Sequence, residues 1–278
     1  SRGLGDADLR STATRRDGVS ELDNIDTEHT QAILRYAYEL SEAATFSVVA
    51  YDNQHKRNWF KTEGIDFDGS ANAQDFSGTS WSSVIGAINT GAAIGDTTSQ
   101  QLQAILNGTL DTPEGSIQLR ANNREYFSRG LQLGLNWEAN IGQTSHTLEL
   151  GVRFHEDEED RLQRNSAYQQ VGGELVLNDI GELGNAGNRV QEAQALAVHI
   201  YDQIEFGRWT ITPGLRYEDI DQMRTNYSGG ANRVFSDSRE NSTDVLLPGV
   251  GALYKVNDTL SAFAGVHKGF TAQRRRSS

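Results

Sequence analysis

The chain has 278 residues, of which 28 are Gly, 3 are Pro and none is Cys, and its formal net charge is −13. This length suggests one or two domains, because large β folds often exceed about 200 residues as one unit. The lack of Cys excludes disulfide scaffolds, Cys-ligated zinc and thiol nucleophiles. The negative charge disfavours nucleic acid as a partner, since phosphate backbones would be repelled. No stretch approaches about 18 consecutive apolar residues, so we predict no transmembrane helix.

Apolar and polar residues alternate along most of the chain, which is the pattern of a strand with two different faces. In the first run, Leu34, Tyr36 and Tyr38 share one face, and Arg35 lies on the other. Seven more runs have the composition of strands. They cover residues 45–59, 128–138, 147–154, 196–206, 209–217, 245–256 and 260–270. We therefore predict an all-β fold, an antiparallel meander of about eight long strands.

Short and long connections alternate strictly between these strands. The short turns are Ser41–Ala44, Asn140–Ser145, Gly207–Arg208 and Asn257–Asp258, and the long polar stretches are about 61–118, 157–190 and 219–243. Outer-membrane barrels have short turns on the periplasmic side and long loops outside. This alternation predicts a partial, open transmembrane β-barrel with its long loops on one side.

The two faces of the strands fit the same prediction. In a wide transmembrane barrel the apolar face contacts lipid and the polar face lines a wet lumen. We expect Leu133, Leu150, Val198 and Leu215 to contact lipid near the middle of the apolar band. Aromatic residues near the strand ends, Trp59 among them, suit interfacial belts. The alternative is that the same apolar residues form the dry core of a soluble β-sandwich.

The stretch 61–118 contains one predicted helix, Thr98–Leu106. Thr98 or Ser99 is suitably placed to cap its N-terminus, and Leu102, Ile105 and Leu106 fall on one side. We expect this helix to bury the apolar residues of its own loop.

Motifs for catalysis or cofactor binding were not found. The sequence has no Gly-x-Ser-x-Gly, no phosphate-binding loop and no His-Glu-x-x-His. The acidic run His155–Asp160 could hold a divalent cation, but consecutive residues of an extended chain point to opposite sides and rarely converge on one ion. We interpret the run as solvated residues where a strand becomes a loop. We predict no enzyme activity, no catalytic residue, no cofactor and no resident metal.

Arg124 and Tyr126 share the parity of the polar face and are candidates for ligand binding. A guanidinium group matches carboxylate oxygens in a bidentate geometry, so Arg124 would suit an anionic ligand. The alternative is that Arg124 pairs with a Glu on a neighbouring strand. Arg129 has the opposite parity, and we expect its side chain to reach toward the outer interface.

The sequence resembles a known family, the barrel domain of TonB-dependent outer-membrane receptors, and particularly the ferric dicitrate and siderophore group. The resembling stretches are 3–8, 26–30, 57–61, 122–130, 209–218, 247–251 and 263–271. Two further candidates for ligand binding, Arg57 and Trp59, lie in one of these stretches. The resemblance implies a large barrel, an N-terminal plug domain and a TonB box. We expect residues 1–278 to form part of the barrel domain, an internal fragment without the plug.

The resemblance also implies a function for the parent protein. That function is energy-coupled import of a ferric chelate, a siderophore or ferric dicitrate, across the outer membrane of a Gram-negative bacterium. The implied partners are outer-membrane lipid, the ferric chelate, and the TonB complex, which would act through the plug and TonB box. Two alternatives remain open at this stage, a passive outer-membrane porin and a soluble extracellular β-sheet module that binds glycans.

Overall fold

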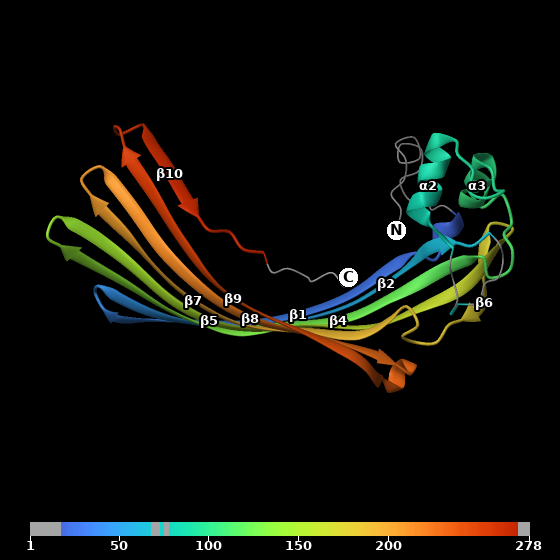
Figure 1. The fold of residues 1–278 in the computed structure, drawn as a ribbon, viewed down its shortest axis with the longest axis horizontal. Helices are drawn as coiled ribbons and strands as arrows, with labels where there is room; N and C mark the ends of the chain where they lie inside the picture. Colours follow the sequence, from blue (N-terminus) through green and yellow to red (C-terminus); the bar gives the residue numbers. More distant parts are fainter. Residues whose placement is uncertain (1–17, 68–72, 75–77, 272–278) are drawn as a thin grey trace.

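The computed structural model describes residues 18–67, 73–74 and 78–271. The strands form one ten-stranded antiparallel sheet, in which eight strands follow one another as β1-β2-β4-β5-β7-β8-β9-β10 (Figure 1). These eight strands are β1 (Asn24–Ser41), β2 (Ala44–Ile65), β4 (Ile117–Ile141), β5 (Thr144–Val171), β7 (Gly187–Phe206), β8 (Trp209–Ser228), β9 (Val234–Lys255) and β10 (Ser261–His267). The all-β meander predicted from the sequence is confirmed.

The sheet is open. Strands β1 and β10 are its two edges and do not pair with each other within the described residues. Two short strands lie off the main path: β3 (Thr79–Ser80) pairs with β2, and β6 (Glu174–Ile180) pairs with β5. The expectation of a partial barrel wall rather than a closed cylinder is therefore confirmed.

The connections have the predicted sidedness. The short turns of β1–β2, β4–β5, β7–β8 and β9–β10 lie at one end of the sheet, on the left of Figure 1. The other end carries two α-helices and β6. This division follows from the meander, because consecutive antiparallel strands reverse direction at alternate ends of the sheet.

The strands are longer than the alternation indicated. β5 continues to Val171, and together with β6 and the start of β7 it makes most of the stretch 157–190 strand. Only 229–233 separates β8 from β9, so the stretch 219–243 is also mainly strand. Beyond the apolar band both faces become polar, which removes the period-two signal, while the backbone ladder continues to pair. Residues 66–116 form the one long connection of the sheet among the described elements. Strand β10 ends at His267, earlier than the predicted Phe270.

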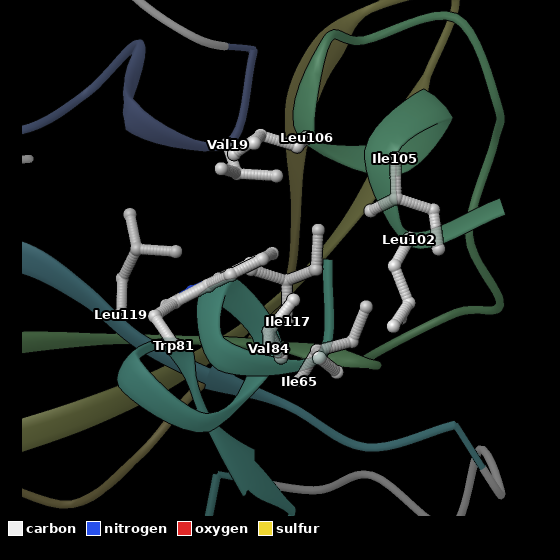
Figure 2. Packing of buried hydrophobic residues seen from close by; sticks show 10 residues of the cluster. Val19, Ile65, Trp81, Val84, Leu102, Ile105, Leu106, Ile117 and Leu119 are labelled. Atoms are coloured by element: carbon white, nitrogen blue, oxygen red, sulfur yellow. The ribbon is translucent and has the colours of Figure 1, made fainter. Parts of the chain in front are cut away.

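This long connection contains a small helical unit of two α-helices. The helix α3 (Ser99–Leu106) is confirmed, with Thr98 as its N-cap and a reciprocal capping box formed with Gln101. A second helix, α2 (Trp81–Thr90), was not predicted from its small, apolar sequence. Figure 2 shows the side chains that meet where both helices pack against the sheet and the 3-10 turn η1 (Gly18–Ser20). They are Val19, Ile65, Trp81, Val84, Leu102, Ile105, Leu106, Ile117 and Leu119.

This cluster lies at one end of the strands, and the regular apolar face of the sheet is not part of it. Leu34 is 68% exposed, Val198 40% and Leu215 40%, although all three belong to the alternating apolar set. The described residues form one sheet, so the apolar set has no second sheet to pack against, as the sandwich alternative would require. Neither α-helix in the described part of the chain is long and apolar enough to span a bilayer.

Candidate functional site

Four arginines form a row across four neighbouring strands. Arg57 on β2 is the register partner of Arg124 on β4, which is paired with Arg161 on β5. Arg161 is paired in turn with Arg189 on β7. Residues directly opposite in a sheet project from the same face with their Cβ atoms about 4.5–5.5 Å apart. We call this set, Arg57, Arg124, Arg161 and Arg189, the arginine row.

The arginine row lies on the polar face and far from the apolar band. On the opposite face, Leu131, Phe154 and Leu196 are register partners that mark the edge of the band. Arg161 follows Phe154 by seven residues, which corresponds to about 23 Å along a strand. The row therefore lies on the strand extensions, toward the end that carries the helices.

The guanidinium groups of the row keep unused hydrogen-bonding capacity. The Nε atoms of Arg57, Arg124, Arg161 and Arg189 are buried, and none has a hydrogen-bond partner in the described part of the chain. A buried donor that is left unpaired costs free energy. The positive charges of guanidinium groups that lie side by side on one face are suited to an anion with several oxygen atoms.

Burial and charge act together on Arg189. Burial, reinforced by the positive charges of Arg161 and Arg224, lowers the pKa of Arg189 to about 10. The group remains protonated at neutral pH, so the lowered pKa reports burial together with repulsion among like charges rather than a neutral arginine. An anion bound to the row would relieve that repulsion.

Glu159 on β5 partly neutralises the row. Its Oε1 accepts a hydrogen bond from Nη1 of Arg124 at 3.0 Å, and its Oε2 accepts one from Nη2 of Arg161 at 2.6 Å. Burial raises the pKa of Glu159, but the hydrogen bond and charge of Arg161 and the charge of Arg124 outweigh burial and leave the pKa below its ordinary value. The pairing of Arg124 with a neighbouring Glu, an alternative left open by the sequence, is thus observed.

Three of the four sequence candidates come together here. Nη2 of Arg57 donates to the Tyr126 hydroxyl at 3.3 Å, and Nη1 of Arg124 lies 3.5 Å from the same oxygen. Tyr126 belongs to the next row of the polar face, in which the rings of His55 and Tyr126 stack with centroids 5.6 Å apart. The result is a surface of guanidinium groups bordered by aromatic rings.

The fourth candidate, Trp59, lies one row further from the apolar band. Its backbone carbonyl accepts a hydrogen bond from Asn122 at 3.2 Å, and the ammonium group of Lys61 lies 4.9 Å from its ring centroid. Trp59 therefore extends the cationic and aromatic surface. It is not part of a belt at the edge of the apolar band, which was the other interpretation of this residue.

Arg129 lies on the opposite face, as its parity predicted. Its side chain is 55% exposed, packs over the Phe127 ring at 4.8 Å and forms a salt bridge with Glu156 of β5 at 2.8 Å. The acidic run 155–160 alternates in the same way, so that Glu159 and Glu156 face opposite sides of β5. The expectation that this run marks the end of a strand is wrong, because β5 continues to Val171.

Sequence reasoning missed Arg161, Arg189 and Glu159 because it placed them in a loop. Arg161 and Glu159 carry the same parity as the polar-face residues of the preceding strand segment, and this signal could have extended the strand. The alignment of Arg161 with Arg124 and Arg189 depends on strand register, which one strand's sequence does not specify.

Comparisons with known proteins agree with this architecture. Residues 2–276 match the family model described as TonB dependent receptor-like, beta-barrel. A crystal structure of the unliganded ferric citrate transporter FecA superposes with a TM-score of 0.63 at 18% identity, over 95% of this chain and 30% of that chain. The open form of the ferric-catecholate import receptor Fiu from E. coli K12 superposes with a TM-score of 0.58 at 14% identity, over 96% of this chain and 40% of that chain. The siderophore receptor PiuA from Acinetobacter baumannii superposes with a TM-score of 0.54 at 11% identity, over 86% of this chain and 31% of that chain.

At these identities the structural likenesses establish the fold alone, and the chain spans between 30% and 40% of the length of these three solved chains. The family model covers nearly the whole chain. Members of this family are transport receptors of the Gram-negative outer membrane. The chain belongs to the family of TonB-dependent receptor β-barrels.

Proposed function

We propose that residues 1–278 form part of the barrel wall of an outer-membrane receptor that imports a ferric chelate by energy-coupled transport. The plug and TonB box of the parent receptor would connect it to the TonB complex. The apolar band would contact outer-membrane lipid. The solved structures of similar fold include a ferric citrate transporter and siderophore receptors, which is consistent with a chelate as the transported ligand.

The arginine row is the observation that carries this proposal. Its four register-paired arginines have unpaired, buried Nε donors and face the side that lines the lumen of a barrel. Such a surface suits a chelate whose carboxylate groups face outward, because guanidinium binds carboxylate with both charge and geometry. We therefore assign Arg57, Arg124 and Tyr126 to the binding surface for an anionic ferric chelate, with Trp59 at its border.

Uptake of radioactive iron by the complete receptor tests the proposal, in a host without other ferric-chelate receptors. Iron supplied as an anionic carboxylate chelate should enter in a saturable manner and stop when the proton-motive force is dissipated. Uptake that is proportional to concentration and unaffected by that treatment would support a passive porin instead.

A matched pair of variants distinguishes a loss of binding at the polar face from general destabilisation of the sheet. Arg124 and Arg129 both lie on β4 and both pair with a Glu of β5, but they project from opposite faces. Arg124→Gln should lower uptake of the anionic chelate by about tenfold, in the range of charge-pair couplings at interfaces. Arg129→Gln should leave uptake close to that of the wild type. Equal effects of the two substitutions would contradict the proposed site.

A further inference from the structure

Glu159 occupies the position that a ligand carboxylate would take on the arginine row. Its two oxygens are shared between Arg124 on the neighbouring strand and Arg161 on its own strand. Only 15% of its side chain is exposed, and the register places it directly opposite Tyr126. The geometry therefore already displays one carboxylate held between two members of the row.

The ion pairs of Glu159 do not include the two outer members of the row, Arg57 and Arg189. The ion pairs of Glu159 involve Arg124 and Arg161, and no hydrogen bond in the described part of the chain joins it to Arg57 or Arg189. Arg224 lies in the same register row as Glu159, separated from it by Gln191. The net charge of this part of the face is thus positive but lower than the arginines alone would make it.

We infer that Glu159 is a built-in competitor for the ligand and sets how much negative charge the ligand must carry. This inference rests on the proposed function. A ligand with one carboxylate gains little, because the central guanidinium groups already hold Glu159. A ligand with several carboxylates can contact the outer arginines as well and so compete with the internal bridge. Glu159 is accordingly a specificity-determining residue that favours polycarboxylate chelates over monocarboxylates.

The test uses the complete receptor in detergent at low ionic strength, where exposed charges are least screened. The probes are citrate and acetate without iron, titrated by calorimetry. Replacing Glu159 by the uncharged Glu159→Gln should tighten citrate binding by about tenfold, the order of one charge-pair coupling. It should also make acetate binding measurable, so that the preference for citrate over acetate narrows.

Glu156 supplies a matched control, because it is also a β5 Glu paired with a β4 Arg but projects from the other face. Glu156→Gln should leave both affinities unchanged. Glu159→Asp retains the charge and should retain the preference for citrate. Thermal unfolding followed by circular dichroism checks that each variant is folded, and citrate should raise the unfolding temperature of Glu159→Gln more than that of the wild type.

The outcomes separate this inference from the proposed function. If the wild type binds citrate and Glu159→Gln binds it no more tightly, the role of Glu159 is refuted while the anion site stands. An equal gain in Glu159→Asp would also refute it, because the effect would then come from shape and not from charge. If neither the wild type nor any variant binds citrate, the anion site fails and the inference fails with it.

Discussion

The Tyr51 hydroxyl on β2 reaches across β4 and hydrogen-bonds to Nδ1 of His155 on β5 at 2.6 Å. Arg153 donates to the same hydroxyl at 3.0 Å. The tyrosine proton is then directed to Nδ1 of His155, which accepts it. Nε2 of the imidazole then carries a proton and donates it to Asp157 at 3.2 Å. The Tyr51 side chain can cross β4 because its register partner on that strand is Gly130, which has no side chain. A Cβ added at Gly130 would lie 2.5 Å from the Tyr51 hydroxyl oxygen.

Gly130→Ala should therefore displace Tyr51 and break this network, and its Cβ would also lie 2.5 Å from the backbone oxygen of Phe154. We expect the free energy of unfolding to fall by about 1–3 kcal/mol, since partly buried polar groups would lose their partners. Gly251→Ala is the control, because a Cβ there meets nothing within 4 Å. That change should be neutral or slightly stabilising, as Ala is favoured over Gly within a strand. Reversible unfolding of the complete receptor in lipid measures the stability of both variants. Equal stabilities would show that Gly130 is not needed to let Tyr51 reach His155.

The apolar face should respond to charge according to its contact with lipid. Leu133→Arg should destabilise the inserted barrel by about 2–4 kcal/mol if Leu133 lies near the membrane midplane. The neighbouring Gln132→Arg places the same charge on the polar face and should cost much less. Equilibrium folding of the complete receptor into lipid vesicles compares the two variants.

Truncation of the same side chain distinguishes lipid from a protein core. Leu133→Ala should cost less than the about 2–5 kcal/mol typical of a cavity in a packed core, because acyl chains can fill the space. A penalty in the core range at Leu133, Leu150, Val198 and Leu215 alike would argue against lipid contact.

Glu158 should destabilise the strand extensions at neutral pH. It lies four residues beyond Phe154 on the outward face, directly opposite Glu192. Burial, followed by the charges of Glu192, Asp160 and Glu156, raises the pKa of Glu158. A carboxyl group whose pKa is higher in the folded state penalises the fold when it is ionised, and the penalty disappears as the pH falls below the ordinary pKa of Glu.

Glu158→Gln should accordingly stabilise this region by roughly 0.2–1 kcal/mol at neutral pH, the range for cross-strand pairs, and by nothing at acidic pH. Hydrogen exchange of the β5 and β7 amides around these residues provides the measurement. Glu156→Gln removes a weaker source of the same repulsion but also breaks the ion pair with Arg129, so its gain should be smaller. Slower exchange that persists unchanged at acidic pH would contradict the electrostatic explanation.

The helical unit should depend on its N-terminal cap. Thr98→Ala removes the hydroxyl that accepts from the backbone N–H of Gln101, and should destabilise α3 by about 0.5–2 kcal/mol. Ser99→Ala is the control, because the Ser99 hydroxyl hydrogen-bonds only to the side chain of Gln100 within the described residues. Amide exchange within α3 should accelerate in the first variant and remain unchanged in the second.

Local sequence determined the parts of this protein whose signal lies within a few residues. Alternation of Leu131, Leu133 and Leu135 with polar residues fixed both the strand and its apolar face, and Thr98 with Gln101 marked the start of α3. Arg124 and Tyr126 could be assigned to the polar face from parity alone. Each of these features depends on the period of one element, which the sequence contains directly.

The tertiary structure decided what depends on register between strands. The arginine row exists because Arg57, Arg124, Arg161 and Arg189 occupy matching positions on four strands, and a shift of one residue would turn a strand's side chains to the other face. The lengths of β5 and β8 were also decided there, since both faces are polar beyond the apolar band and the backbone pairs without any alternating signal. Glu159 could be recognised as the counter-ion of the row only after β4 and β5 had been aligned.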